Sequence, residues 1–192
     1  HNPASDANAF TFMANERVHM QEAYAGDIIG VFDPGIFSIG DTVCAKDHKV
    51  KFEGIPTFAP ECFAMVEQTD SMKRKQFAKG MNQIAQEGAI QIFTEPGGGL
   101  ERVYVGVVGE LQFDVLESRM KSEYGVTYRQ YPQPYQYIRR ISNGADPAKL
   151  HLFDVKWVQD FRGNNFLLFK TEWQVSHTLE DNAGLELVEF GH

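Results

Sequence analysis

A run of basic residues is the sequence feature best suited to binding chemistry. It consists of Lys73, Arg74, Lys75 and Lys79. The run begins in the first turn of the clearest predicted helix, 71–87, where the helix macrodipole favours anions and each cation costs roughly a few tenths of a kcal/mol. Such donors suit contact with a sugar-phosphate backbone. A solvated face with local pairs, such as Lys79 with Gln83 or Glu87, is the alternative interpretation.

The same helix is predicted to be amphipathic. Cationic and amide side chains recur at i, i+4, i+7 and i+11 on the side expected to face solvent, and these are Lys75, Lys79, Asn82 and Gln86. Apolar side chains with helical period mark the opposite side, and these are Phe77, Ala78, Met81, Ile84 and Ala85. The helix is therefore expected to pack one face on a core and to present the basic stripe outward.

No pattern in the sequence predicts catalysis or a bound cofactor. Gly97-Gly98-Gly99 is followed by Leu100-Glu101-Arg102 and another strand rather than by a Lys-Ser/Thr pair entering a helix, so it is interpreted as a hairpin tip. The six histidines form no metal-binding motif, and no GxSxG sequence surrounds a serine. Cys62 lies in an apolar strand, where an inert core thiol is expected. We therefore expect no catalytic, cofactor-binding or metal-binding residue in this chain.

Composition limits the class of protein further. The 192 residues are 43% hydrophobic and 23% charged, with a net charge of −8, which opposes wholesale non-specific binding to nucleic acid such as DNA. No apolar run approaches the roughly 20 residues of a membrane span, and the first residues do not form a signal peptide. Two cysteines without CxxC spacing favour a reducing compartment. A cytoplasmic protein without membrane or DNA partners is predicted.

The middle of the chain alternates strands and helices in a recognisable order. Strands are expected at 61–68, 89–94, 103–108 and 126–131, with helices at 71–87 and 110–124. The order β-α-β-β-α-β predicts an α+β fold with a split βαβ, ferredoxin-like sheet covered by two helices. A C-terminal α/β extension follows, with predicted strands at 135–141, 166–169 and 185–190 and predicted helices at 147–158 and 173–179.

The first fifty residues lack helical periodicity and contain short strands separated by glycine. Strands are expected there at 10–13, 27–32 and 41–44, with a turn at Asp33-Pro34-Gly35. The character changes at Lys49, and a strand at 50–52 is expected to begin the next domain. About forty residues are too few to close a barrel of the usual size. We therefore expect 1–48 to be the closing strands of a partial β-barrel in a fragment, and 49–192 to be a separate α+β domain.

Several segments together resemble one family, the bacterial peptide chain release factor 3 proteins, which are translational GTPases. The resemblance rests on FTFMA at 10–14, EAYAGDIIG at 22–30, IGDT at 39–42, KFEGIPTFAPE at 51–61, KRKQFAKGMNQIAQEGAIQIF at 73–93 and VGVVGELQFDVLESRMKSEYGV at 105–126. Within the last of these, VVGELQF at 107–113 also resembles elongation factor G, another translational GTPase. The chain departs from the pattern at Ala25, where the family tends to have proline, and over its last fifty residues.

The resemblance implies a non-catalytic C-terminal region of a termination GTPase. GTP or GDP with Mg²⁺ would bind a GTPase domain that this chain lacks. The implied partner is the ribosome, through ribosomal RNA and a small-subunit protein, and the implied role is to promote release of class I release factors. The basic run 73–79 is the expected contact, with Arg119 and Lys121 as weaker candidates. The alternatives are a free-standing α+β interaction module for a protein or small ligand, and the equivalent region of another translational GTPase.

Overall fold

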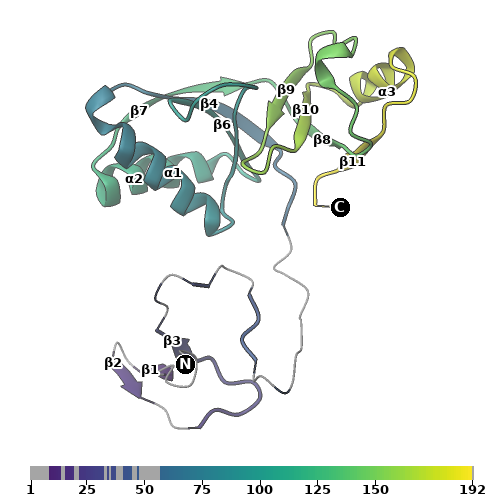
Figure 1. Ribbon diagram of the computed structural model, residues 1–192. Helices are drawn as coiled ribbons and strands as arrows, with labels where there is room; N and C mark the ends of the chain where they lie inside the picture. Colours follow the sequence, from purple (N-terminus) through teal and green to yellow (C-terminus); the bar gives the residue numbers. More distant parts are fainter. Residues whose placement is uncertain are drawn as a thin grey trace. The chain divides into compact units, whose positions relative to one another are not determined.

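The computed structural model describes residues 9–13, 16–19, 22–32, 34, 36–37, 41–44, 47 and 57–191. The chain separates into two compact units, His1–Glu53 and Gly54–His192 (Figure 1). The domain boundary predicted at 48/49 lies outside the described residues, as do the predicted strand at 50–52 and two residues of the predicted turn at 33–35.

The described part of the smaller unit contains one three-stranded antiparallel sheet in the order β2-β1-β3. The strands are β1 (Ala9–Met13), β2 (Glu16–His19) and β3 (Gly30–Val31). The strand predicted at 10–13 is confirmed, but only two residues of the segment 27–32 pair as a strand, and 41–44 is not a strand. Interpreting every glycine-bounded apolar run as a strand therefore predicts more strand than the described part of this unit contains.

The first half of the larger unit has the predicted β-α-β-β-α-β order. Its elements are β4 (Cys62–Gln68), α1 (Arg74–Gln86), β5 (Gln91–Phe93), β6 (Arg102–Val107), α2 (Leu111–Tyr124) and β7 (Tyr128–Gln133). All neighbouring strands are antiparallel in the order β5-β6-β4-β7. This is the split βαβ arrangement, and it confirms the predicted α+β fold class.

Local signals in the sequence set where the first two helices begin and end. A 3₁₀ turn, Ser71–Lys73, precedes α1, and the Asp70 carboxylate accepts a hydrogen bond from the Met72 N–H at 2.9 Å. Gly125 ends α2 with φ +63°, a left-handed conformation that carries no Cβ penalty in glycine. In the described residues no helix is long and apolar enough to cross a membrane.

The second half of the larger unit forms another antiparallel sheet, in the order β11-β8-β10-β9. Its strands are β8 (Tyr137–Ile141), β9 (Lys156–Gln159), β10 (Asn165–Phe169) and β11 (Leu187–Glu189), and it carries one α-helix, α3 (Glu172–Asp181). A complete capping box begins α3: the Thr171 hydroxyl accepts from the Gln174 N–H, and the Gln174 side chain accepts from the Thr171 N–H.

The helix predicted at 147–158 is wrong. Only Pro147–Lys149 is helical, as a 3₁₀ turn, and the end of the segment belongs to β9, where Val158 pairs with Phe166. The buried Asn182 side chain bonds to both the N–H and the C=O of His151, at 2.7 and 3.0 Å. These contacts satisfy backbone groups that would bond within a helix, so tertiary contacts override the local preference.

The larger unit is a stack of four layers, in which α1 and α2, the first sheet, the second sheet and α3 follow one another (Figure 1). The helix side of the first sheet is aliphatic, with Ala64, Val66 and Val105 against Met81 and Leu116. The opposite side carries Phe63, Phe93 and Tyr104, which pack on Ile138, Val158 and Phe166 of the second sheet. A β-bridge between Thr94 and Gln159 also joins the two sheets. The two halves therefore share a core.

Close packing of α1 on α2 depends on Gly80. A Cβ added there would lie 2.6 Å from the Met120 sulfur and 2.9 Å from the Tyr124 ring. Because real Cβ contacts are not this short, a larger residue would push the two helices apart. Glycine is thus required in the middle of α1 despite its low helix propensity.

Replacing Leu116 by alanine should lower the free energy of unfolding by about 2–5 kcal/mol, because a fully buried side chain at 1% exposure leaves a cavity. Val115→Ala on the same helix, at 58% exposure, is the matched control and should change stability by less than about 0.5 kcal/mol. Urea unfolding followed by circular dichroism measures both. Equal losses in the two variants would show that the buried face of α2 is misassigned.

Gly80→Ala should destabilise the protein by about 1–3 kcal/mol, because overpacking at the helix contact outweighs the helix propensity gained with alanine. Gly99→Ala serves as the control, since a Cβ at Gly99 meets no atom within 4 Å. Thermal unfolding of both variants provides the comparison. A Gly80→Ala protein as stable as the parent would contradict the close approach of the helices.

Candidate functional site

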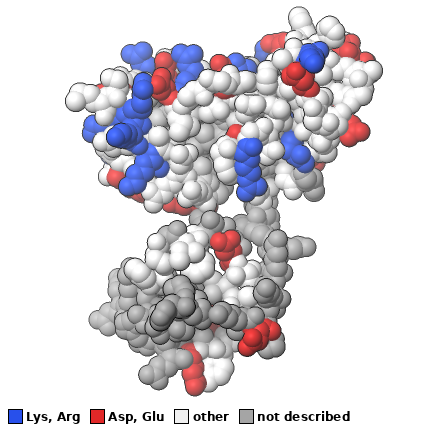
Figure 2. Space-filling model, in the orientation of Figure 1, with Lys and Arg blue, Asp and Glu red and all other residues white. Residues whose placement is uncertain are grey.

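The predicted basic stripe lies on the outer surface of α1. Lys75 and Lys79 are exposed, as are Asn82 and Gln86 further along the same face. The buried residues of α1, Phe77, Gly80, Met81 and Ile84, lie on the other side of the helix. Figure 2 shows lysine and arginine side chains gathered over the layer that contains α1 and α2. The amphipathic pattern therefore placed these residues correctly.

Lys75 and Lys79 form no ion pair or hydrogen bond with any other described residue. The local partners considered for Lys79 are engaged elsewhere: Gln83 accepts a hydrogen bond from the Tyr124 hydroxyl at 2.9 Å, and Glu87 bonds to Arg119. The two ammonium groups thus remain hydrated and available to an external anion, which makes them the best candidates on this helix.

The other two members of the run have neighbours inside the protein. Arg74 forms an ion pair with Glu101, and both side chains are more than half exposed. Lys73 is half-buried, and its Nζ lies 3.7 Å from where a Cβ of Gly125 would be. That position is the C-terminal end of α2, where the macrodipole favours a cation. Lys73 therefore contributes to helix packing, and Arg74 is partly neutralised.

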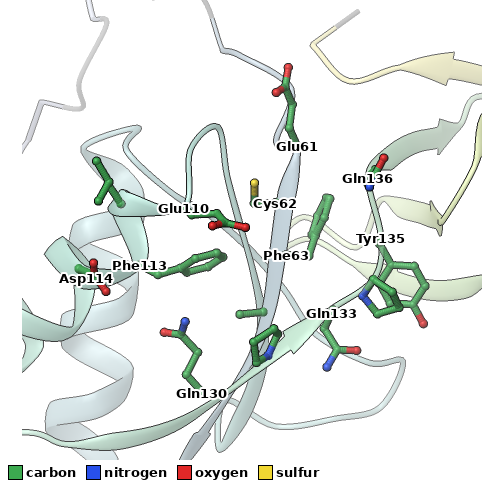
Figure 3. A pocket seen from close by; sticks show the side chains of 14 residues that line it. Glu61, Cys62, Phe63, Glu110, Phe113, Asp114, Gln130, Gln133, Tyr135 and Gln136 are labelled. Atoms are coloured by element: carbon green, nitrogen blue, oxygen red, sulfur yellow. The ribbon is translucent and has the colours of Figure 1, made fainter.

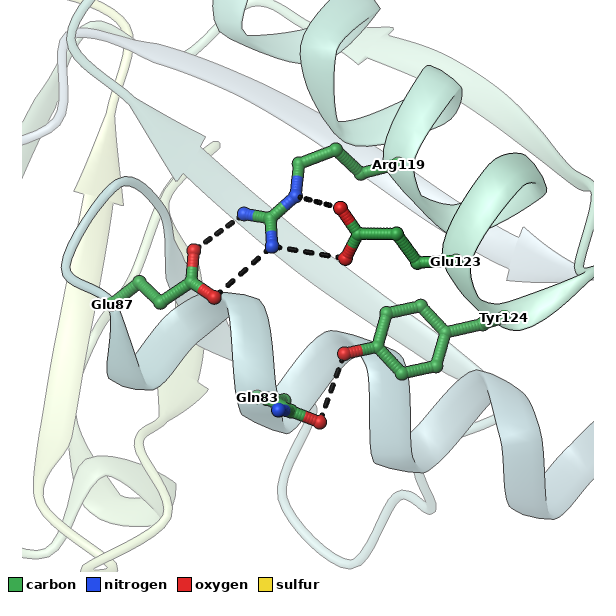
Figure 4. A network of polar contacts seen from close by, with 5 residues as sticks. All are labelled: Gln83, Glu87, Arg119, Glu123 and Tyr124. Carbon is green, nitrogen blue, oxygen red and sulfur yellow. Dashed lines mark hydrogen bonds and ion pairs between the residues drawn. The ribbon is translucent and has the colours of Figure 1, made fainter. Parts of the chain in front are cut away.

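Arg119 is held in a network between the two helices (Figure 4). Its guanidinium bonds to both carboxylate oxygens of Glu87, at the end of α1, and to both oxygens of Glu123, with Nε–Oε1 at 2.9 Å to the latter. These hydrogen bonds lower the pKa values of Glu87 and Glu123 and raise the pKa of Arg119. The Arg119 guanidinium therefore links α1 to α2 and is occupied by these two carboxylates.

Lys121 is exposed in the last turn of α2. Successive helical residues are separated by about 100°, so Lys121 lies roughly 200° around the helix from Arg119, which faces α1. It has no ion-pair partner among the described residues. Lys121 is therefore an available cation, but it lies apart from the stripe on α1.

Carboxylates gather at a groove beside α2, which we call the acidic groove (Figure 3). It has a volume of about 450 Å³ and lies between the beginning of α2, the beginning of β4 and the end of β7. Its carboxylates are Glu61, Glu110 and Asp114. Burial, together with the charges of Glu110 and Glu61, raises the pKa of the Cys62 thiol there, so this cysteine is held as an uncharged thiol.

Sequence reasoning missed the acidic groove and the partners of Arg119. The pairing of Arg119 with Glu123 follows i,i+4 spacing and could have been found, whereas Glu87 is 32 residues away. The groove combines three segments that are separate in the sequence, so no local pattern indicates it.

The glycine-rich segment is a hairpin tip between β5 and β6, as predicted. The described residues contain no cluster of three or more side chains suited to hold a metal.

Replacing Arg119 by glutamine should reduce stability most near neutral pH. Because Glu87 has a lowered pKa in the folded protein, its contribution is complete above its ordinary pKa of 4.5 and is lost as pH falls through the folded value. Urea unfolding of both proteins between about pH 8 and pH 3 should show a difference that is constant down to about pH 5 and shrinks below it. A difference that persists unchanged at the acid end would contradict the network.

Comparison with known proteins identifies the family. The family described as "Class II release factor RF3, C-terminal domain" matches residues 52–179. The chain is 48% identical over 175 residues to peptide chain release factor 3 of Symbiobacterium thermophilum, which covers 91% of this chain and 33% of that protein. It is 40% identical to the protein of the same name from Gloeothece citriformis and 39% identical to that from Microcystis aeruginosa.

The chain spans about a third of the length of these relatives, and the match covers nearly all of it. The family match extends from the segment before β4 through the greater part of α3, so it includes the whole first sheet, three strands of the second sheet and the basic run on α1. The chain belongs to the peptide chain release factor 3 family and contains its C-terminal domain.

Proposed function

We propose that this chain is the ribosome-contacting, non-catalytic part of a cytoplasmic translation termination GTPase. The full-length protein would promote departure of class I release factors. GTP or GDP with Mg²⁺ would bind a GTPase domain in a part of that protein outside this chain. Family membership supports a role in termination. The proposal of contact rests on Lys75 and Lys79, which are exposed and have no partner in the described part of the chain.

The proposed contact is between the outer face of α1 and ribosomal RNA or a small-subunit protein. A net charge of −8 does not prevent this, because only the contacting patch exchanges counterions with the nucleic acid. Lys75 and Lys79 would contact phosphate oxygens, and Asn82 and Gln86 would add neutral hydrogen bonds along the same face. Arg74 would contribute by exchanging Glu101 for a phosphate.

The helix layer would transmit this contact to the rest of the domain. Arg119 joins the end of α1 to α2, and Tyr124 joins α2 to Gln83. Both helices are packed on the first sheet through a continuous apolar core. A force on α1 would therefore move the helix layer and the sheet as one body, which suits a domain that serves as an anchor or lever without a nucleotide site of its own.

The double variant Lys75→Ala/Lys79→Ala in the full-length protein tests this proposal. Ribosome binding should weaken most at low salt, and the slope of log affinity against log salt should flatten by about 0.7–0.9 for each phosphate that the variant no longer neutralises. Affinity for GTP should not change. Sedimentation of ribosomes with the bound protein across a salt series measures the first effect.

Lys149→Ala/Arg162→Ala is the matched control, because it removes two exposed cations from the second half of the unit. It should leave both the affinity and the salt slope unchanged. Equal weakening of ribosome binding in the two double variants would indicate a general charge effect. Unchanged ribosome affinity of the Lys75→Ala/Lys79→Ala protein would mean that the stripe is only a solvated face. Either result would refute the proposed contact.

A further inference from the structure

The acidic groove has the size and lining of a binding site. Its volume of about 450 Å³ lies within the range of roughly 300–1,000 Å³ that ligand sites usually have. Cys62, which is partly exposed, and the edge of Phe113 supply apolar surface along it, whereas Phe63 and Ala64 lie beneath it with at most 2% exposure. Pro132, Pro134 and Tyr135 form a second wall from the end of β7 and the segment after it. The groove therefore offers apolar contact as well as charge.

The carboxylates at the groove have no partners in the described part of the chain. The side chains of Glu61, Glu110 and Asp114 form no ion pair or hydrogen bond there, and no lysine or arginine lines the groove. Asp114 lies in the first turn of α2 and Glu110 is its N-cap residue, where the macrodipole favours their charges. Glu110 nevertheless extends across the groove toward Cys62, with Phe113 beside it (Figure 3).

The groove is lined on the side opposite α2 by β7, which is an edge strand of the first sheet. β7 pairs with β4 on one side, and no described strand pairs with its other side. Such an edge presents unpaired backbone N–H and C=O groups that an extended peptide can use. Gln130, Gln133 and Gln136 line the groove from this side, and their amide carbonyl oxygens accept hydrogen bonds.

From this juxtaposition we infer that the acidic groove binds an extended protein segment that carries arginine or lysine. The three carboxylates supply the complementary charge, and the glutamine amides supply further acceptors. The apolar surface would contact the methylene groups of the ligand's arginine or lysine side chains, or apolar residues that alternate with them. Nucleic acid is disfavoured, because unpaired carboxylates repel phosphates. This site is separate from the basic stripe on α1, and the inference does not depend on the proposed ribosome contact.

A synthetic peptide tests the inference directly on the 192-residue chain. The probe is a fluorescent eight-residue peptide in which arginine alternates with valine, and fluorescence anisotropy measures its affinity. The comparison peptide has glutamine in place of every arginine and should bind much more weakly. The double variant Glu110→Gln/Asp114→Asn should weaken binding of the arginine peptide by about three- to tenfold, as expected for partly exposed charge pairs.

The matched control is Glu117→Gln/Glu180→Gln, which removes two exposed carboxylates that do not line the groove. Its affinity for the arginine peptide should equal that of the parent chain. NMR should also show shifts of the Tyr131 and Gln133 backbone amides on β7 when the peptide binds. These results together would support an extended segment in the acidic groove.

Four results would overturn the inference. They are failure of the arginine peptide to bind, equal binding of the glutamine peptide, equal weakening by the control variant, and amide shifts that leave β7 unaffected. Equal binding of the glutamine peptide would mean that apolar contact alone recognises the ligand. Equal weakening by the control would mean that net charge, rather than the groove, attracts the peptide.

Discussion

Both faces of the sheet β5-β6-β4-β7 are apolar, and the rest of the larger unit follows from the need to cover them. Along β4, Ala64 and Val66 face the helices, whereas Phe63 and Met65 face the second sheet. Burying apolar area is the main favourable term in folding, so neither face can be left in water. α1 and α2 cover the aliphatic face, and the second sheet covers the aromatic one. The outward face of α1 is thereby determined.

Positive and negative side chains lie on separate surfaces of the larger unit, although the net charge of the chain is −8. On the outer face of α1 lie cations that have no partner among the described residues, and beside the beginning of α2 lie carboxylates of which the same is true. Between the two helices, Arg119 is neutralised by Glu87 and Glu123. This segregation allows one domain to present surfaces that attract oppositely charged partners, which a uniform distribution of the same residues would not do.

Much of the fold could be predicted because the signals for it are local. Periodicities of 3.6 and 2 residues identified the βαββαβ order, and Gly125 marked the end of α2. The helix predicted at 147–158 failed because pairing with β10 and the Asn182 side chain, both distant in sequence, decide that segment. β7 continues through Pro132, which an edge strand tolerates. At the site, helical spacing revealed Lys75 and Lys79, but the acidic groove required the three-dimensional arrangement.

We propose above all that the outer face of α1 is the surface that meets the ribosome. Hydroxyl-radical footprinting of the full-length protein, free and ribosome-bound, tests it most directly, since Met72 beside the basic run is 87% exposed and Trp173 on α3 is 67% exposed. Both side chains are readily oxidised and report on different layers of the same unit. We expect Met72 to be protected on the ribosome while Trp173 stays reactive. Protection of Trp173 with undiminished oxidation of Met72 would contradict the account.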